Sequence, residues 1–281
     1  MKYLYIFCIF QLLLLPLRGE TVEESTALHI VSFNIHYDKK GDPQGSWESR
    51  KEMVMDIITS FDFDMAGLQE VSQSQLVDFQ ALGTYGTIGE GINGGTSGSQ
   101  NTILYKKSRV ELLDSGIFWL SSTPEYPSLG WDATFNRNCP WGKFRDRLSG
   151  KEFFFFDAHF DHYGEEARIN SAYLVYSVIK EKTGGLPVFF MGDLNSEENS
   201  ETIAFLNKKL SNARENSLTE PKGPVGTGHG FRINRNVRRI DYIYYSGENV
   251  QIVEFETIDR LYDGKAPSDH WAIRIKAILE P

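Results

Sequence analysis

Apolar residues that alternate with polar ones, or that form short runs, predict most of the strands. Residues 28–35 alternate in this way, and Leu186 to Met191 form an apolar run of strand length that ends at Gly192. Residues 133–139 and 142–148 predict a strand broken near Pro140, and residues 83–99 predict a long loop or ragged hairpin. Further strands are expected at 65–70, 101–105, 110–113, 116–120, 153–160, 239–245, 250–257 and 271–277.

Apolar positions spaced three and four residues apart predict four helices. The expected helices cover residues 47–60, 72–82, 165–182 and 200–209. Strands outnumber helices, no repeat or linker divides the chain, and two strand-rich halves straddle the region near Lys151. The pattern predicts an α/β fold in which two packed sheets carry helices on their outer faces.

The N-terminus has the pattern of a secretory signal peptide. Lys2 precedes the apolar stretch Leu4 to Leu15, and Pro16 ends that stretch. We expect a signal peptide over residues 1–19, cleaved near Gly19, and one domain over residues 20–281. The protein is then exported to a periplasm or the extracellular space. An uncleaved anchor is the alternative, although the stretch is short for a membrane span, and no later segment predicts one.

Charge and cysteine content narrow the function classes. The formal net charge of −9 argues against a general nucleic-acid binder, because nonspecific affinity for polyanions requires basic surface. Cys8 falls within the signal peptide, so Cys139 remains alone and no intrachain disulfide can form. We expect Cys139 to be a buried, unreactive thiol. No feature of the sequence indicates an obligate protein partner.

Polar residues recur where the predicted strands end. Taken singly, each has an ordinary explanation as a turn, cap or loop residue. Their repeated placement at the ends of apolar strands predicts instead that they meet in one site. The set comprises Asn34, Glu70, His159, Asp193, Asn195, Asp241, Asp269 and His270.

These residue types suit metal-assisted cleavage of a phosphoester. Carboxylate and amide oxygens favour Mg²⁺ or Mn²⁺, whereas zinc-type motifs such as HExxH are missing from the sequence. A carboxylate can deprotonate water, and a histidine held by a second carboxylate can stabilise the developing charge or protonate the leaving oxygen. A serine hydrolase is disfavoured because there is no GxSxG.

The motifs that contain these residues, taken in order, resemble the endonuclease/exonuclease/phosphatase superfamily with the deoxyribonuclease-I-like fold. They are SFNI at 32–35, LQE at 68–70, AHFDH at 158–162, GDLN at 192–195, IDYI at 240–243 and SDH at 268–270. The resemblance implies a four-layer α/β sandwich and a Mg²⁺-dependent phosphoesterase. Ala158 and Leu194 depart from the usual family residues, and we expect Leu194 to pack beneath the site.

The resemblance also implies a role for each site residue. Asn34 and Glu70 would hold the metal, with Asp269 nearby. Asp193 would orient or deprotonate the attacking water, and Asn195 would contact the scissile phosphate. His270, paired with Asp241, would act on the phosphate, and His159 would contact its oxygens from the other side.

The substrate class remains open at the level of sequence. We expect a phosphodiesterase or nuclease, acting as an endonuclease or a 3′–5′ exonuclease. A phosphomonoesterase for sugar or inositol phosphates, or a catalytically silent phosphate-binding protein, are the alternatives. Segments 131–137 and 141–146 resemble an exported bacterial subgroup near the deadenylase-like branch.

Several basic and aromatic residues have two possible interpretations each. The basic ones could clamp phosphate or be solvated charges, and the tryptophans could stack on bases or belong to the core. They are Arg137, Lys143, Arg145, Arg232, Arg235, Arg238, Arg239, Trp119, Trp131 and Trp141.

Overall fold

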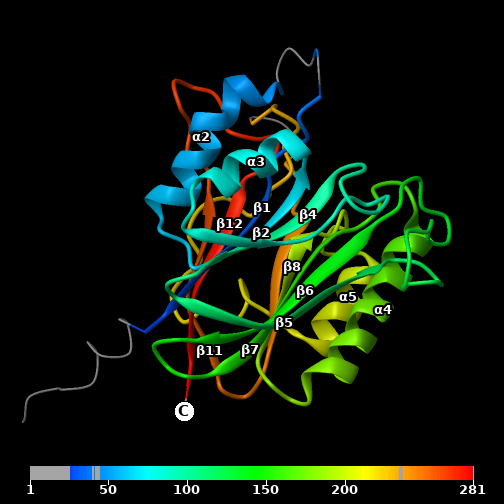
Figure 1. Cartoon of the computed structure of the whole chain (residues 1–281), viewed down its shortest axis with the longest axis vertical. Helices are drawn as coiled ribbons and strands as arrows, with labels where there is room; N and C mark the ends of the chain where they lie inside the picture. The colour runs from blue at the N-terminus through cyan, green and yellow to red at the C-terminus, as the bar shows by residue number, and fades with distance from the viewer. Residues whose placement is uncertain (1–25, 40, 42–44, 234–236, 281) are drawn as a thin grey trace, which may run out of the picture.

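The computed structural model describes residues 26–39, 41, 45–233 and 237–280 (Figure 1). The predicted signal peptide and its cleavage site lie outside the described residues. In the described part of the chain, no helix is long and apolar enough to cross a membrane.

The strands form two six-stranded sheets. The first sheet has the order β11 (Val250–Ile258), β12 (Ala272–Leu279), β1 (Leu28–Asn34), β2 (Met65–Val71), β4 (Gln100–Lys106) and β3 (Tyr85–Ile88). The second has the order β5 (Val110–Trp119), β6 (Asn138–Asp146), β7 (Glu152–His159), β8 (Val188–Asp193), β10 (Asp241–Ser246) and β9 (Ser211–Asn212). Each sheet contains one parallel pair, β1 with β2 and β7 with β8, and its other pairs are antiparallel.

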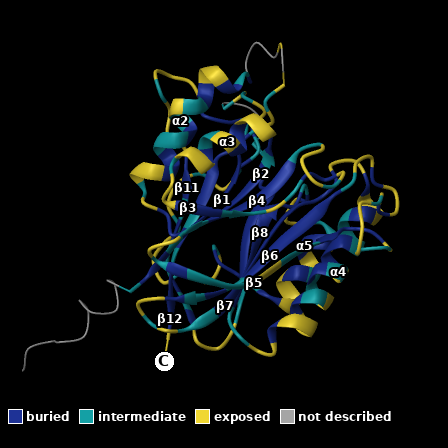
Figure 2. Cartoon of the chain, viewed as in Figure 1, coloured by how far each residue is buried: buried dark blue, intermediate teal, exposed yellow. Residues whose placement is uncertain are grey.

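Helices cover the outer face of each sheet, which gives four layers. α2 (Trp47–Ser60) and α3 (Gln73–Ala81) lie against the first sheet, and α4 (Glu165–Thr183) and α5 (Glu201–Lys209) lie against the second (Figure 1). The predicted four-layer α/β sandwich with two mainly antiparallel sheets is confirmed. Figure 2 shows the consequence for burial, since the strands are largely buried and the exposed residues gather on the outer sides of the helices and in loops.

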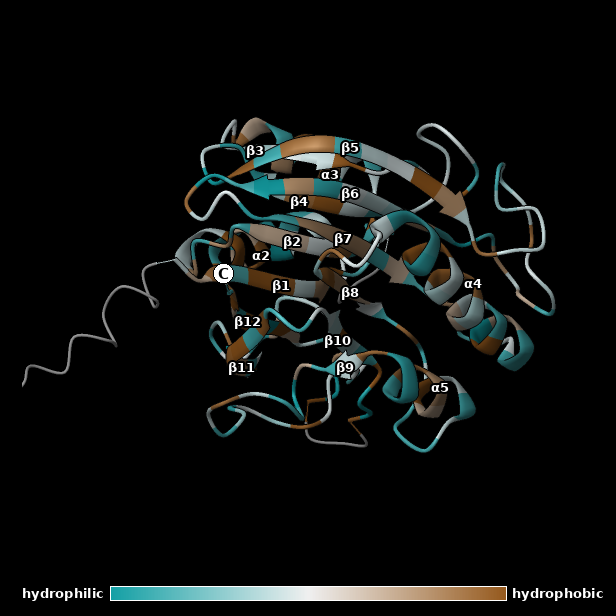
Figure 3. Cartoon of the chain, turned by 90° about the horizontal axis from the view of Figure 1, so that it is seen from below, coloured by the Kyte–Doolittle hydropathy of each residue, from teal (hydrophilic) through white to brown (hydrophobic). Residues whose placement is uncertain are grey.

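Alternation along the strands divides the core into layers. Phe153 and Phe155 of β7 pack between the two sheets, whereas Phe154 and Phe156 pack under the helices. Successive strand residues point to opposite faces, so a strand buried on both sides reads as a continuous apolar run. These runs are the hydrophobic segments that Figure 3 shows on the central strands, such as β1, β2 and β7.

Three details of the predicted strand pattern are wrong. β6 begins only at Asn138 and continues through Pro140. Pro140 pairs with Ile117 of β5 and needs no partner on its other side, because the pairing of β6 with β7 starts at Trp141. A proline is tolerated where only one neighbour requires pairing. Residues 110–119 form one strand, β5, in which a register shift between Leu112 and Asp114 absorbs the apparent break.

The chain does not divide into two halves near Lys151. The second sheet starts already at β5, and the last two strands, β11 and β12, return to pair beside β1 in the first sheet. Alternation predicts where a strand lies along the chain but not which strand it pairs with.

Candidate active site

Four predicted site residues lie at one end of their strands and face inward, toward the other sheet. Asn34 follows Leu28 and Ile30 on the inner face of β1, and Asp193 follows Phe189 and Met191 on that of β8. In the register of the second sheet, Asp193 lies opposite both His159 of β7 and Asp241 of β10. The period of two that buries the core therefore also places these side chains between the sheets, at one end of the sandwich.

Gly192 is required by this close strand arrangement. Its φ angle is +143°, and a Cβ atom at this position would lie 1.8 Å from the carbonyl oxygen of Ala158 in β7. Ala158 and Leu194, the two departures from the usual motifs, are fully buried under the helices of the second sheet. The expectation that Leu194 packs beneath the site is confirmed.

Glu70 reaches the same place through an irregularity in β2. The pairing of β2 with β4 shifts register between Leu68 and Val71, and Glu70 has a φ angle of +61°. Its carboxylate accepts a hydrogen bond from the Asn34 amide at 3.3 Å and one from the backbone N–H of Tyr37 at 3.0 Å. The irregular backbone interrupts the alternation, so both Gln69 and Glu70 interact with residues between the sheets.

Asp193 is at the centre of the hydrogen-bond network. Its Oδ2 accepts from the Asn34 amide at 3.0 Å and lies 3.4 Å from His159 Nε2, while its Oδ1 accepts from the backbone N–H of Asn195 at 3.0 Å. Burial and the nearby charge of Asp241 raise the pKa of Asp193 to about 7. The carboxylate thus joins residues of both sheets.

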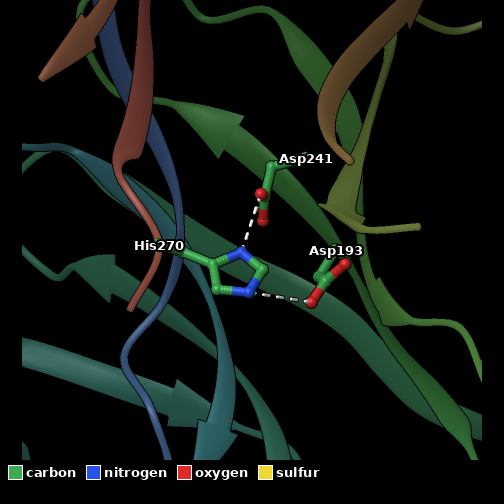
Figure 4. Close-up of side chains that lie close together, drawn as sticks. All are labelled: Asp193, Asp241 and His270. Atoms are coloured by element: carbon green, nitrogen blue, oxygen red, sulfur yellow. Dashed lines mark hydrogen bonds and ion pairs between the residues drawn. The ribbon is translucent and has the colours of Figure 1, made fainter. Parts of the chain in front are cut away.

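His270 lies between two carboxylates (Figure 4). Its Nδ1 is 2.8 Å from Asp241 Oδ2, and its Nε2 is 3.7 Å from Asp193 Oδ2. Burial would lower the pKa of His270, but the charges of Asp241 and Asp193 outweigh it and hold the pKa well above 6.5. The arrangement keeps a cationic imidazole in a buried site.

His159 has the opposite character. The amide nitrogen of Asn195, which has a φ angle of +47°, lies 3.0 Å from both His159 Nε2 and the carbonyl oxygen of Phe160. Because an amide nitrogen only donates, Nε2 of His159 accepts and carries no proton. Burial, and then the charge of Arg137, lower the pKa of His159 well below 6.5. The two histidines are therefore a neutral and a charged imidazole in one site.

The donor set is suited to a hard cation. Glu70 supplies a partly exposed carboxylate beside the Asn34 amide, and Asp241 Oδ1 accepts no hydrogen bond from any residue that the structure describes. Ligand atoms of Asp193, Asp241 and His270 also lie within 4.8 Å of one another. In that cluster the imidazole of His270 already contacts both carboxylates. Among the described residues, the nearest cationic group to the Glu70 carboxylate is His36, at 4.0 Å. Oxygen donors next to concentrated negative charge fit Mg²⁺ or Mn²⁺.

Asp269 lies apart from the other predicted metal ligands. Its carboxylate is 3.2 Å from His36 Nδ1, and that nitrogen is 4.0 Å from Glu70 Oε2, so His36 stands between the two acids. Burial would raise the pKa of Asp269, but the hydrogen bond with His36 and the charge of His270 lower it. A role of Asp269 in holding a metal stays a prediction.

A cavity of about 560 Å³ opens at this end of the sandwich. Glu70, His159, Asp193, Asn195 and His270 line it, and Arg137, His162, Phe135 and Asn93 are also among its lining residues. Seven of the eight predicted site residues are therefore connected by hydrogen bonds or short contacts, namely the five that line the cavity, with Asn34 and Asp241 behind its wall.

The ambiguous basic and aromatic residues separate by position. Lys143 and Arg145 form ion pairs with Glu152 on the sheet surface, and Arg239 pairs with Glu198. Arg137 lines the cavity, and Arg232 and Arg238 line an adjoining one. Trp119 and Trp141 are buried, whereas Trp131 is partly exposed. Arg235 lies outside the described residues, and Cys139 is buried as expected.

Two buried polar residues beneath the site, one of them in the LQE motif, have no role of their own in the sequence prediction. Gln69 donates a hydrogen bond of 2.6 Å to Asp157 and so joins β2 to β7, one residue from Glu70 and two from His159. Both are 0% exposed. Their polarity inside otherwise apolar strands was a detectable signal, but nothing in the sequence identified them as partners.

A third such residue is Arg50 of α2, which is buried. Its guanidinium donates to four backbone carbonyls, those of Ile35, His36, Gly45 and Pro267. These carbonyls adjoin the segments that carry Asn34 and Asp269, so the hydrogen bonds of Arg50 hold these two segments next to each other.

Two packed sheets bring acids, amides and histidines together at one end, and such a residue set is suited to metal-assisted hydrolysis. The model of the endonuclease/exonuclease/phosphatase family matches residues 31–270, and the chain belongs to this family. Members of the family are generally phosphoester hydrolases and typically depend on a divalent metal.

Solved structures of the same family are similar over nearly the whole chain. An endonuclease/exonuclease/phosphatase from Bacteroides vulgatus is 33% identical with a TM-score of 0.86, covering 91% of this chain and 100% of that one. A mannosyl-6-phosphatase from Bacteroides thetaiotaomicron is 31% identical with a TM-score of 0.82, covering 89% and 99%. The human Nocturnin catalytic domain, 18% identical with a TM-score of 0.73 over 90% and 94%, shares the fold.

Two uncharacterised proteins of Acanthamoeba polyphaga mimivirus are also similar, at 25% identity over 161 residues and 26% over 254. The matches cover 54% and 77% of this chain, and 60% and 37% of those proteins.

Proposed function

We propose that the protein is an exported, Mg²⁺- or Mn²⁺-dependent phosphoester hydrolase that acts on the phosphomonoester of a sugar. The observation that carries the proposal is the network of contacts that joins Asn34, Glu70, Asp193 and the Asp241–His270 pair around one cavity. The cation would be held by Glu70 and Asn34. When bound, it offsets negative charge on the phosphate oxygens.

The residues of the chain account for the rest of the reaction. Asp193 orients a water molecule and takes its proton as the water oxygen bonds to phosphorus and the bond to the leaving oxygen breaks. His270, kept cationic by Asp241, gives a proton to the leaving oxygen and recovers one from Asp193, 3.7 Å away. Asn195 and His159 would bind phosphate oxygens once the substrate displaces the hydrogen bonds of Asn195 Nδ2 to His159 Nε2 and to the Phe160 carbonyl, with the proton of the neutral imidazole on Nε2. No covalent intermediate forms.

Two observations favour a small monoester over the diester that the sequence placed first. The chain is 31% identical to a mannosyl-6-phosphatase over almost the full length of both. In addition, Asn136 Nδ2 donates to Asn93 Oδ1 at 3.1 Å, so a loop from each sheet meets the other beside the cavity. This contact favours a compact ligand or a chain end over an open groove for a polymer.

A phosphodiesterase or nuclease is the second candidate. Arg232 and Arg238 line a cavity that adjoins the first and shares Arg238, Ile240 and His270 with it. Cations beside the scissile phosphate suit a second phosphate of a nucleic acid.

A substrate panel separates these functions. The protein is incubated with hexose 6-phosphates, an aryl phosphodiester and DNA or RNA oligonucleotides, with Mg²⁺, with Mn²⁺ or with EDTA. We expect metal-dependent phosphate release from a hexose phosphate, and a loss of kcat of about 100-fold or more in Asp193→Asn and His270→Ala. Asp259→Asn, which changes an exposed aspartate, is the matched control.

Each other outcome has a definite meaning. Cleavage of the diester or an oligonucleotide without hexose phosphate turnover supports the second candidate. Phosphate binding without any turnover identifies a catalytically silent protein and refutes the proposal.

A further inference from the structure

One part of the cavity wall is not used by the proposed chemistry. Phe135 and Arg137 reach it from the loop before β6, and His162 reaches it from the loop after β7. We call these three residues the leaving-group wall. The wall consists of a phenyl ring, a guanidinium and an imidazole, whereas the residues proposed for catalysis are acids, amides and two other histidines.

A single buried carboxylate builds this wall. Asp161 accepts hydrogen bonds from four backbone N–H groups, those of Thr134, Phe135, Tyr163 and Gly164, at 2.9 to 3.3 Å. Burial would raise its pKa, but the hydrogen bonds from Gly164 and Tyr163 outweigh burial and lower it. An anion with four N–H donors fixes both loops at once, so the wall is preorganised rather than a chance meeting of surface side chains.

Arg137 supplies a nearly buried positive charge. It is 7% exposed, its Nε lies 3.7 Å from Asp161 Oδ2, and its Nη2 lies 3.2 Å from His162 Nδ1. Since a guanidinium only donates, Nδ1 of His162 accepts, and the proton of the neutral ring is on Nε2. Arg137 and His162 both therefore present N–H donors to whatever oxygen-rich ligand fills the cavity.

Phe135 adds a flat apolar surface beside these donors. Its ring stacks on His162 with centroids 5.8 Å apart and planes 16° apart, yet the residue is 49% exposed. An exposed aromatic that keeps a fixed orientation at the edge of a cavity is a platform for a ligand.

We propose that the leaving-group wall binds the ring of a sugar phosphate and makes the enzyme selective for polyhydroxylated leaving groups. The C–H face of a pyranose packs on Phe135, and its hydroxyl oxygens accept from Arg137 and His162. A nucleobase fits less well, because the wall offers one aromatic platform and mainly donors, and the chain is acidic. This inference rests on the proposed phosphoester hydrolysis.

The test compares two phosphates with the same primary alkyl ester, one with a ring and one without. The probes are a hexose 6-phosphate and 2-hydroxyethyl phosphate, and the readout is the ratio of their kcat/KM values. We expect wild type to prefer the hexose phosphate about 100-fold or more, and Phe135→Ala to reduce this ratio about tenfold. Phe135→Tyr, which keeps the platform, restores most of it.

Two further variants complete the set. Tyr173→Ala removes an aromatic of α4 that is 44% exposed and does not line the cavity, and it should keep the wild-type ratio within twofold. Arg137→Lys keeps the charge but not the planar fork, and should lower the ratio about tenfold while thermal unfolding checks that the protein is folded.

The outcomes separate the two proposals. If wild type hydrolyses neither probe nor any phosphate of the panel, the proposed function fails. If wild type hydrolyses both probes and Phe135→Ala lowers both rates equally, the function stands and the leaving-group wall is wrong. A preference for nucleoside 5′-monophosphates over hexose phosphates overturns the sugar assignment.

Discussion

Asp157 is the buried acid whose replacement most sharply tests the reasoning about the interior. Its side chain is 0% exposed, its Oδ1 accepts from Gln69 at 2.6 Å, and its Oδ2 has no hydrogen-bond partner among the described residues. Burial raises its pKa well above 3.8, and the hydrogen bond from Gln69 only partly opposes this. Asp157→Asn keeps the shape and removes the titratable proton.

The sign of the effect follows from linkage. An acid whose pKa is higher in the folded than in the unfolded state stabilises the fold below the unfolded pKa, and this contribution is lost as the pH rises through the folded pKa. One proton changes the free energy of unfolding by at most about 1.4 kcal/mol per pH unit. As the pH rises above the ordinary aspartate pKa of about 4, wild type should therefore lose stability relative to Asp157→Asn, by at most about 1.4 kcal/mol per pH unit, until the folded pKa is passed.

Urea unfolding at pH 5, 6, 7 and 8 in the presence of EDTA measures this difference without a contribution from bound metal. Asp114→Asn, at an exposed position of β5, should follow the pH dependence of wild type. If Asp157→Asn is as pH-dependent as wild type, then Asp157 is not held protonated in the folded protein, and the argument from burial is refuted.

Three further predictions concern the frame and the metal. Arg50→Met removes the donors to four carbonyls and should lower the free energy of unfolding by about 3 kcal/mol or more, measured by urea unfolding. Gly192→Ala forces a Cβ to 1.8 Å from the Ala158 carbonyl oxygen and should prevent a stable fold, whereas Gly184→Ala, with no atom within 4 Å, should cost only about 1–2 kcal/mol; thermal unfolding distinguishes them, and equal effects would contradict the steric argument. Glu70→Gln should weaken Mg²⁺ binding about tenfold or more in calorimetric titration, and an unchanged affinity would remove Glu70 from the metal site.

The sequence predicts a strand or helix well where the residues of that element alone determine its pattern. The predicted helix over residues 47–60 has the observed bounds of α2, and the apolar run before Gly192 is β8. The return of β11 and β12 to the first sheet was not predictable from alternation, because pairing depends on partners far along the chain. The bulge in β5 likewise has the sequence pattern of a break, since one extra residue interrupts the alternation as a turn does.

The candidate site shows the same division. The recurrence of polar residues at strand ends correctly indicated that Asn34, Asp193 and His270 belong together. The sequence did not reveal how Asp161 joins two loops through backbone N–H groups, since any residue other than proline supplies such a donor. Arg137 and Arg145 have the same two interpretations in the sequence, as phosphate clamps or as solvated charges. The fold separates them, because Arg137 lines the cavity and Arg145 forms a surface ion pair.

Because both sheets contribute to the site, the proposed activity depends on the packing between them. Glu70 and Asn34 belong to the first sheet, and Asp193 and His159 belong to the second. The hydrogen bond from Asn34 to Asp193 crosses between the sheets within the site itself. A change that shifts one sheet against the other therefore separates the proposed metal ligands from the residue proposed to activate water, even when no site residue is altered. The buried bond between Gln69 and Asp157 crosses at the next inward position, so these two residues should affect catalysis through the spacing of the sheets.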